Sequence, residues 1–347
     1  MPATIDEALD ILRDTGPEFG GGLSNHGPMA AEALFALGRP DAVIPWVERY
    51  KRRLQESPDA RSPIPREAWK EALGDVRRVG DWIALFDREL TGAAWPEVLR
   101  EWVPRLAPGL MAGATHGLIR TAHAVRSLAA GETAERRHEL AGGLGYWAAR
   151  YQELPGRPGA GNGRRLPAEA LAEVERVNGP EYLPRGLIFQ AVRGLDEQPS
   201  FAGAIDLVDT AGDLPDFISN LTETFAGVYL ANPRDPIGFI HSVTAPSALR
   251  ILAPYLSDAD ARLAARYAWQ ACAALYAWYG VLPPDPGSAP IGAEGGRDEL
   301  ADRAVASDDE HAIKFTEACL REHALNPQPV YLAAARDASE RLRRAWS

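Results

Sequence analysis

The chain has 347 residues, 46% of them hydrophobic and 24% charged, which is ordinary for a globular protein with a substantial core. Its formal net charge of −11 argues against nucleic acid or an anionic membrane as partner, because phosphate-binding proteins usually present a basic face. The N-terminal segment lacks the apolar core of a signal peptide, and no apolar run of about 18 residues could span a bilayer. We therefore expect a cytoplasmic protein, and the sequence gives no indication of its oligomeric state.

Helical periodicity and helix-terminating residues run through most of the chain. They predict helices at 4–14, 28–38, 40–54, 115–130, 133–152, 213–230, 240–255, 258–280, 308–323 and 328–345, with three shorter amphipathic stretches over 66–106. Alternating β patterns are almost absent. The predicted fold is therefore all-α: a large multi-helix bundle in which residues 1–347 form a single domain.

The Pro/Gly-rich stretch 155–166 is the strongest loop signal, followed by a second one at 281–297. The first stretch is a boundary between two lobes, a surface loop, or a lid over the mouth of an active site. Its glycines form no dinucleotide-binding fingerprint, because the required strand before and helix after them are missing. No Walker-type phosphate loop is present either, so the sequence does not predict a Rossmann-bound cofactor.

Four of the seven histidines share a position at or just before the start of a predicted helix: His26, His116, His241 and His311. Each is followed seven or eight residues later by alanine and a second apolar residue. This shared offset would point four imidazoles into one cavity of a helical bundle, where metal sites are commonly built. Imidazole suits iron, zinc, copper and nickel. The alternative is that each histidine caps a helix or packs as a polar residue. Two further histidines, His138 and His323, are expected to be exposed.

His123 lies seven residues after His116, two turns along the same helical face. Ligands two turns apart are about 10 Å apart along the helix axis, which is far for one metal ion. We therefore expect His123 to orient His116 or to contact substrate, as a general acid or base near neutral pH.

Lys314 lies one turn after His311 and is one of only three lysines among 37 basic residues. An ammonium group cannot bind a cation, so a lysine ligand would have to be deprotonated or carboxylated on its nitrogen. A carbamate would supply an oxygen ligand and a negative charge, which arginine cannot do. The alternative is an exposed lysine that pairs with Glu310 or Glu317.

Three arginines, Arg120, Arg126 and Arg250, share helices with the candidate histidines. Inside a helical core they would need carboxylate partners or an anionic substrate group. The candidate carboxylates are Asp308, Asp309 and Glu223. We assign a catalytic role to Arg120. Two cysteines, Cys272 and Cys319, are expected to be buried free thiols. Aromatic residues that either line a flat pocket or belong to the core are Trp147, Tyr151, Phe225, Tyr229 and Phe239.

Five segments, in this order over residues 20–340, resemble the questin oxidase-like family: Asn25–Gly27, His116–Arg120, Tyr146–Tyr151, Phe239–Thr244 and Asp308–Lys314. The resemblance implies an all-helical oxidase or oxygenase of polycyclic aromatic polyketides with a histidine-ligated non-haem iron. It also brings in NADPH, which would be an external reductant because no binding motif is present. Arg120 and His123 stand where many relatives have other residues.

The function that follows from residues and resemblance together is an iron-dependent mono- or dioxygenase. Fe(II) would be bound by His26, His116, His241 and His311, with Lys314 as a fifth ligand or a close amine. O₂ and a small aromatic or quinone substrate would react there, opening a ring by C–C cleavage or by a Baeyer–Villiger-like route. Two alternatives stay open: a zinc-dependent hydrolase on the same scaffold, and a non-enzymatic binding protein for an aromatic metabolite.

Overall fold

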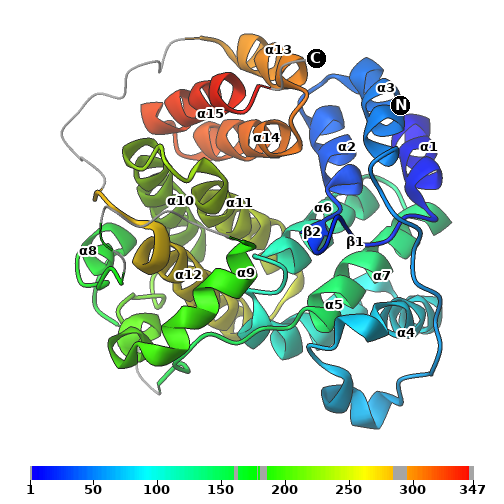
Figure 1. Cartoon of the computed structure of the whole chain (residues 1–347), viewed down its shortest axis with the longest axis horizontal. Helices are drawn as coiled ribbons and strands as arrows, with labels where there is room; N and C mark the ends of the chain where they lie inside the picture. Colours follow the sequence, from blue (N-terminus) through cyan, green and yellow to red (C-terminus); the bar gives the residue numbers. More distant parts are fainter. Residues whose placement is uncertain (1, 160–162, 178, 180–185, 284–294, 344–347) are drawn as a thin grey trace. The chain divides into compact units, whose positions relative to one another are not determined.

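A computed structural model describes residues 2–159, 163–177, 179, 186–283 and 295–343. In these residues α-helices and short 3-10 helices make up nearly all regular structure, which confirms the all-α prediction (Figure 1). The described strands, β1 (Glu18–Phe19) and β2 (Leu23–Ser24), form one short antiparallel hairpin. None of the described helices is both long and apolar enough to cross a membrane.

The chain divides into two compact units. Unit 1 comprises residues 1–35, 39–153 and 251–261, and unit 2 comprises residues 36–38, 154–250 and 262–347. One division falls between Glu153 and Leu154, directly before the predicted loop 155–166. The expectation that residues 1–347 form a single domain stays a prediction.

Unit 1 is built around helix α7, which packs against both α4 and α6. Its elements, besides the hairpin, are α1 (Pro2–Leu12), α2 (Gly27–Ala36), α3 (Pro40–Lys51), η1 (Arg66–Ala72), η2 (Val76–Arg78), α4 (Val79–Gly92), α5 (Trp95–Leu106), η3 (Ala107–Gly109), α6 (His116–Ala130), α7 (Ala134–Ala149) and η6 (Ala253–Tyr255).

Glycines allow α7 to approach both neighbours closely. A Cβ added to Gly143 would lie 2.9 Å from the backbone nitrogen of Thr121 on α6. A Cβ on Gly145 would lie 3.0 Å from the backbone nitrogen of Ile83 on α4. These distances are too short for a real Cβ. The glycines of α7 therefore set how closely α7 packs against α4 and against α6, the helix that presents His116.

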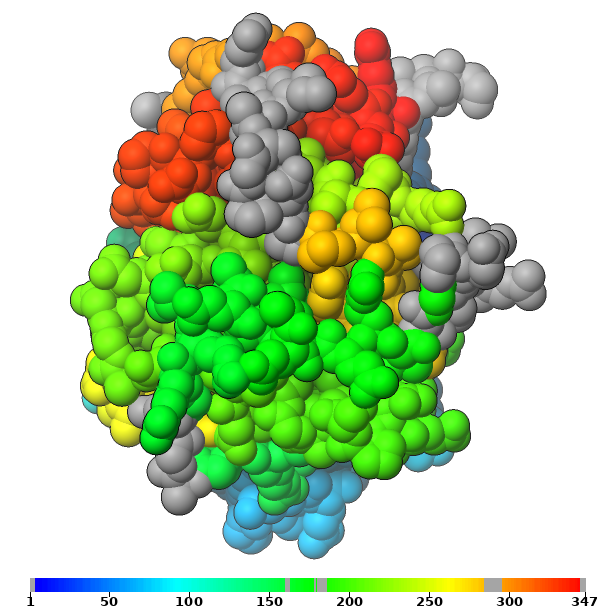
Figure 2. Space-filling model, turned by 90° about the vertical axis from the view of Figure 1, so that its left-hand side faces the viewer, coloured from blue at the N-terminus to red at the C-terminus, as the bar shows by residue number. Residues whose placement is uncertain are grey.

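Unit 2 contains the remaining helices, of which α14 packs against α15 and α13, and α15 also packs against α10 (Figure 1). Its elements are α8 (Pro167–Leu171), α9 (Ile188–Ala191), η4 (Val192–Glu197), η5 (Pro199–Asp206), α10 (Leu214–Ala231), α11 (Pro236–Leu252), α12 (Asp258–Tyr279), α13 (Arg297–Ser307), α14 (Glu310–Leu325) and α15 (Pro329–Arg341). Figure 2 shows one side of this unit. The green segment that follows Glu153 lies on the surface there, and the orange and red C-terminal helices lie above it.

The described part of the loop 155–166 is hydrogen-bonded to unit 2. Gln270 donates through Nε2 to the carbonyl oxygens of Pro155, at 2.9 Å, and Gly156, at 3.1 Å. The Gly159 N–H donates to Asp206 Oδ1 at 2.9 Å. Residues 160–162 of this stretch, and 284–294 of the second predicted loop, lie outside the described residues. A role of 155–166 as a lid stays a prediction.

Most predicted helices are present within a few residues of their expected bounds. The prediction missed α8, α9 and α13, which are short or rich in charged residues, and it placed the start of α11 too late. His241 therefore lies in the second turn of α11 rather than at its start. Cys272 and Cys319 are buried free thiols, as expected, and burial raises the pKa of both.

Candidate functional site

Unit 1 brings His26 and His116 together. Their ring centroids are 4.5 Å apart and the ring planes are inclined by 34°. Both side chains are buried. His26 directly precedes α2 and His116 is the first residue of α6, so the two helix starts that the sequence singled out in this unit do meet.

The backbone of His26 is fixed by its neighbours. Asn25 donates through Nδ2 to the Gly16 carbonyl at 2.9 Å and accepts the Gly27 N–H on Oδ1 at 2.9 Å. The His26 N–H donates to the Tyr50 hydroxyl at 3.0 Å. A Cβ on Gly27 would lie 2.9 Å from a methyl group of Leu12, so glycine is needed for this close approach. The Asn-His-Gly sequence is therefore a tightly packed helix start.

The imidazole of His116 has one tautomer. Its Nδ1 lies 2.6 Å from the carbonyl oxygen of Gly113. A carbonyl only accepts hydrogen bonds, so Nδ1 holds the proton and Nε2 holds the lone pair of the neutral ring. Metal-binding histidines usually donate their second ring N–H in this way. In this tautomer Nε2 is the ring nitrogen that could bind a metal, and metal binding by His116 stays a prediction.

A left-handed backbone turn leads into His116. Gly113, Ala114 and Thr115 have φ values of 54°, 58° and 70°. The non-glycine residues with positive φ in the described ranges are Ala114, Thr115 and Asp308. Ala114 and Thr115 lead into α6, which begins at His116, and Asp308 lies between α13 and α14, three residues before His311. Such conformations cost of order 1–2 kcal/mol per residue and tend to cluster at functional sites.

Unit 2 brings His241 and His311 together, with ring centroids 5.9 Å apart and ring planes at 77°. His241 donates through Nδ1 to the Ile237 carbonyl at 2.7 Å, so its lone pair also lies on Nε2. Burial lowers the pKa of His241 well below its usual value, and the nearby positive charges of His311 and Lys314 lower it further. The ring is therefore neutral at physiological pH, which is the form that binds metals.

Two carboxylates accompany His311. Asp309 caps α14: its Oδ1 accepts the N–H groups of His311 at 2.8 Å and Ala312 at 3.2 Å. The same oxygen lies 3.5 Å from His311 Nδ1. One donor atom each from Asp309, Glu310 and His311 lie within 4.8 Å of one another. The sequence interpretation considered Asp309 as a partner of an arginine and Glu310 as a partner of Lys314, but neither as a metal ligand. Acidic residues directly before a candidate ligand were the signal that it missed.

Lys314 is buried, with 2% of its surface exposed. The alternative of an exposed surface lysine is therefore wrong. Burial lowers the pKa of its amine to about 7, although the negative charges of Glu310 and Asp309 partly oppose this shift. A large fraction of the amine is thus neutral near pH 7. Metal binding by Lys314, and its carboxylation, stay predictions.

His123 is held by Glu32, which the sequence interpretation did not identify. His123 Nδ1 lies 2.7 Å from Glu32 Oε2, and Arg126 donates through Nε to Glu32 Oε1 at 2.7 Å. Burial raises the pKa of Glu32, but the charge of Arg126 and the hydrogen bonds from His123 and Arg126 outweigh it and lower the pKa overall. The ionised carboxylate accepts the Nδ1 proton of His123 and places the lone pair of the neutral ring on Nε2.

The three arginines have carboxylate partners, but not the ones predicted. Arg120 donates through Nε and Nη2 to the two oxygens of Glu139, each at 2.7 Å. Arg126 pairs with Glu32, and Arg250 with Glu322. The expected partners were wrong because other groups use them: Asp309 caps α14, and Glu223 accepts a hydrogen bond from Asn326 at 2.8 Å.

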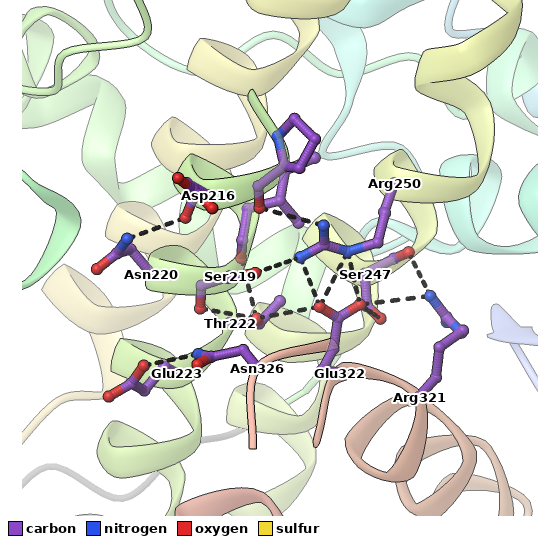
Figure 3. A network of polar contacts seen from close by, with 12 residues as sticks. Asp216, Ser219, Asn220, Thr222, Glu223, Ser247, Arg250, Arg321, Glu322 and Asn326 are labelled. Carbon is purple, nitrogen blue, oxygen red and sulfur yellow. Dashed lines mark hydrogen bonds and ion pairs between the residues drawn. The ribbon is translucent and has the colours of Figure 1, made fainter. Parts of the chain in front are cut away.

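Glu322 joins α11 to α14 (Figure 3). This fully buried carboxylate accepts from Arg250 Nη2 at 2.8 Å, from Ser247 Oγ at 2.5 Å and from Arg321 Nη1 at 3.4 Å. His241 and Arg250 on α11 meet His311 and Glu322 on α14 in the same order, so the two helices run parallel here. The network therefore fixes the two helices that present the histidine pair of unit 2.

The two histidines outside the proposed site and the aromatic residues considered for a pocket are all at least half-buried. His138 and His323 are half-buried rather than exposed, and His138 Nδ1 lies 3.0 Å from Asp87 Oδ1. Four of the five aromatic residues considered for a pocket are buried in the core: Trp147, Phe225, Tyr229 and Phe239. Tyr151 is half-buried.

One family model, described as Questin oxidase-like, matches residues 23–174. The match covers somewhat less than half of the chain, lies mainly in unit 1 and includes the histidine pair of that unit. It confirms the resemblance over these residues, and the family's name indicates an oxidase. His241, His311 and Lys314 lie outside the matched range. No curated protein matches the chain.

Proposed function

We propose, from the match of residues 23–174 to the Questin oxidase-like family, that the chain is an iron-dependent oxidase that opens a ring of a polycyclic aromatic or quinone polyketide. One observation supports the metal most directly. In each unit a buried histidine, His116 or His241, donates its Nδ1 proton to a backbone carbonyl and thereby directs its Nε2 lone pair to a ligand.

The donor set fits a first-row transition metal. Unit 1 would supply His26 and His116, and unit 2 would supply His241 and His311. Neutral imidazoles do not offset the charge of a ferric ion, so an anionic group would help to stabilise it. Lys314, if carboxylated, is the anion that the sequence suggested, and Glu310 is a second candidate that lies beside His311. Binding of a single ion by all four histidines stays a prediction.

Bound Fe(II) would supply the one-electron chemistry that lets O₂ react with an electron-rich phenol or hydroquinone. His123 would hold or move a proton at Nε2, since Glu32 fixes its Nδ1. Arg120 would contact a substrate phenolate through Nη1 or through the second N–H of Nη2, because Glu139 accepts the Nε proton and one Nη2 proton. The substrate, or an external reductant such as NADPH, would supply the electrons.

The test is metal analysis of protein purified without oxygen, followed by O₂ uptake with a panel of hydroxylated anthraquinones. Bound iron, O₂ consumption and a ring-opened product would support the proposal. Zinc without O₂ uptake would favour the hydrolase. Protein that binds an anthraquinone but neither metal would favour the binding protein, in which the histidines hydrogen-bond the ligand.

Stoichiometry tests whether the two pairs share an ion. If they do, titration gives one metal per chain, and replacing a histidine of either unit weakens the same binding event. Two metals per chain, each lost with one pair only, would contradict a shared site.

A further inference from the structure

The hydroxyl of Tyr146 on α7 lies between the two backbone segments that present His26 and His116. On one side it is 2.8 Å from Ser24 Oγ, two residues before His26. On the other side it lies against Gly113, whose carbonyl fixes the ring of His116. Tyr146 is thus in contact with both of these histidine-bearing segments of unit 1.

The contact with the His26 segment is a charged network on the β-hairpin. Tyr146 donates its hydroxyl proton to Glu18 Oε1 at 2.9 Å, and Arg150 binds both oxygens of Glu18 at 2.6 Å. Burial, together with the charge of Glu18, raises the pKa of Tyr146, so the phenol keeps its proton. Because that proton goes to Glu18, the Ser24 hydroxyl must donate to the Tyr146 oxygen. The hydrogen bonds of this network therefore have one direction.

The contact with the His116 segment is steric. A Cβ on Gly113 would lie 2.5 Å from the Tyr146 hydroxyl oxygen, so only glycine fits above the phenol. The next residue of α7, Trp147, donates through Nε1 to the Gly109 carbonyl at 3.2 Å and leaves no space for a Cβ on Gly117. Consecutive aromatic residues of α7 thus support the left-handed turn before His116 on both sides.

We infer that Tyr146 is a positioning residue, which sets the distance and orientation of the His26 and His116 imidazoles for a shared ligand. The inference rests on the proposed function in that the ligand is a metal ion. Tyr146 acts through Ser24 and Gly113 and does not itself touch the ion. Residues of this kind, which orient the ligands, commonly change metal affinity by 10- to 100-fold when they are replaced.

The test is Tyr146→Phe, with Tyr331→Phe as the matched control. The Tyr331 hydroxyl is also buried and also has two partners, Thr222 Oγ1 at 2.8 Å and the Ser219 carbonyl at 3.0 Å, but it belongs to the α10–α15 packing of unit 2. Both variants lose a buried hydroxyl, so their melting temperatures should fall by similar amounts. Titration with Co²⁺ should show about tenfold weaker binding for Tyr146→Phe only. Equal affinities for the wild type and Tyr146→Phe, or an equal loss in Tyr331→Phe, would overturn the inference.

A second measurement does not need a metal. Histidine ring ¹⁵N spectra of the metal-free protein report which nitrogen holds the proton. The wild type should show His116 with the proton on Nδ1, and Tyr146→Phe should show a mixture of tautomers, whereas Tyr331→Phe should match the wild type. If the wild type binds no metal but the tautomer changes as described, the proposed function fails and the positioning role stands. If the His116 tautomer is the same in all three proteins, Tyr146 has no positioning role.

Discussion

His241 donates its Nδ1 proton to the carbonyl oxygen of Ile237, one turn earlier in α11, at 2.7 Å. Residues four apart on a helix are neighbours, so the bond orients the ring without a second helix. It also leaves the lone pair on Nε2, the nitrogen that faces away from the local backbone. His116 reaches the same state by another route, through a left-handed turn that brings the Gly113 carbonyl to its Nδ1.

His241→Ala should therefore remove metal binding, while His323→Ala should leave it intact. The control is a half-buried histidine of the same unit, on α14, which has no role in the proposed site. We expect Co²⁺ affinity to fall at least 100-fold in the first variant and to stay within twofold in the second. In unit 1, His116→Ala and His138→Ala form the corresponding pair. Equal metal binding by a site variant and its control would exclude that histidine as a ligand.

Glu322→Gln should destabilise the protein by about 3 kcal/mol, because breaking a buried ion pair leaves an uncompensated charge. Arg250 and Arg321 would both face an amide in place of the carboxylate. The control is Glu299→Gln, which affects the surface pairs with Arg303 at 3.0 Å and Arg336 at 3.2 Å and should change stability far less, because exposed ion pairs contribute little. Urea unfolding measures both. A similar small effect in both variants would mean that the Glu322 network does not hold α11 to α14.

The all-α fold, and the burial of the residues seven to nine positions after each candidate histidine, could be predicted because both depend on local sequence patterns. The alanine and apolar residues that follow each candidate histidine, such as Ala124 and Val125 or Ala248 and Leu249, are all buried. Helices rich in charge, such as α13, were missed because their apolar stripe is narrow. Short 3-10 segments give little periodicity, so they were missed as well.

Ion-pair partners could not be predicted, because they depend on which helices become neighbours. Arg120 and Glu139 are separated by a turn and lie on α6 and α7, whose spacing is set by glycines of α7. Glu32 reaches His123 from α2, far away in the sequence. The left-handed turn at Ala114 and Thr115 was also unpredictable, since neither residue type favours that conformation.

Glu32→Gln should cost stability at neutral pH and little in acid. The pKa of Glu32 is lowered in the folded protein from its ordinary value of 4.5. Its contribution is therefore fully present above about pH 4.5 and is lost as the pH falls through the folded-state value. We expect a loss of about 3 kcal/mol at pH 7, as for a broken buried ion pair. Urea unfolding at pH 7 and below pH 4 should show the difference between the two proteins narrowing. A constant difference would mean that the pairing with Arg126 and His123 is not electrostatic.

Glu32→Gln should also change the pH dependence of catalysis if His123 moves a proton. An amide stabilises the imidazolium less than a carboxylate does, so the apparent pKa of a step that needs protonated His123 would fall. The rate of that step should then decline at lower pH than in the wild type. Asp81→Asn breaks another arginine pair of the same unit, between the buried Asp81 and Arg78, and should leave this pH dependence unchanged. The same shift in both variants would show that it comes from general loosening of unit 1.

Lys314→Arg tests the proposed carbamate or neutral amine. Guanidinium stays protonated and takes up no CO₂, so the variant should fold but bind Fe(II) at least tenfold more weakly and lose ring-opening activity. Lys314→Ala should be partly rescued by added formate or acetate, which could supply the missing oxygen ligand. Full iron binding by Lys314→Arg would remove Lys314 from the site and leave Glu310 as the candidate anion.

Lys314 should also make the stability of the metal-free protein depend on pH. The pKa of its amine is about 7 in the folded state, against 10.5 when unperturbed. Between these values the unfolded chain binds one proton more than the folded chain, so the free energy of unfolding rises with pH over this interval. Below pH 7 both states are protonated, and the folded protein bears the full cost of a buried ammonium group.

Lys314→Met removes that cost, so its stability relative to the wild type should be highest near pH 6 and should decline steadily toward pH 10. Unfolding of both proteins in urea at intervals of one pH unit measures this, and the difference between them cancels the titration of groups that do not interact with Lys314. A difference that does not vary with pH would mean that the amine keeps its ordinary pKa in the folded protein. Lys314 would then be protonated at neutral pH and could neither bind a metal ion nor take up CO₂.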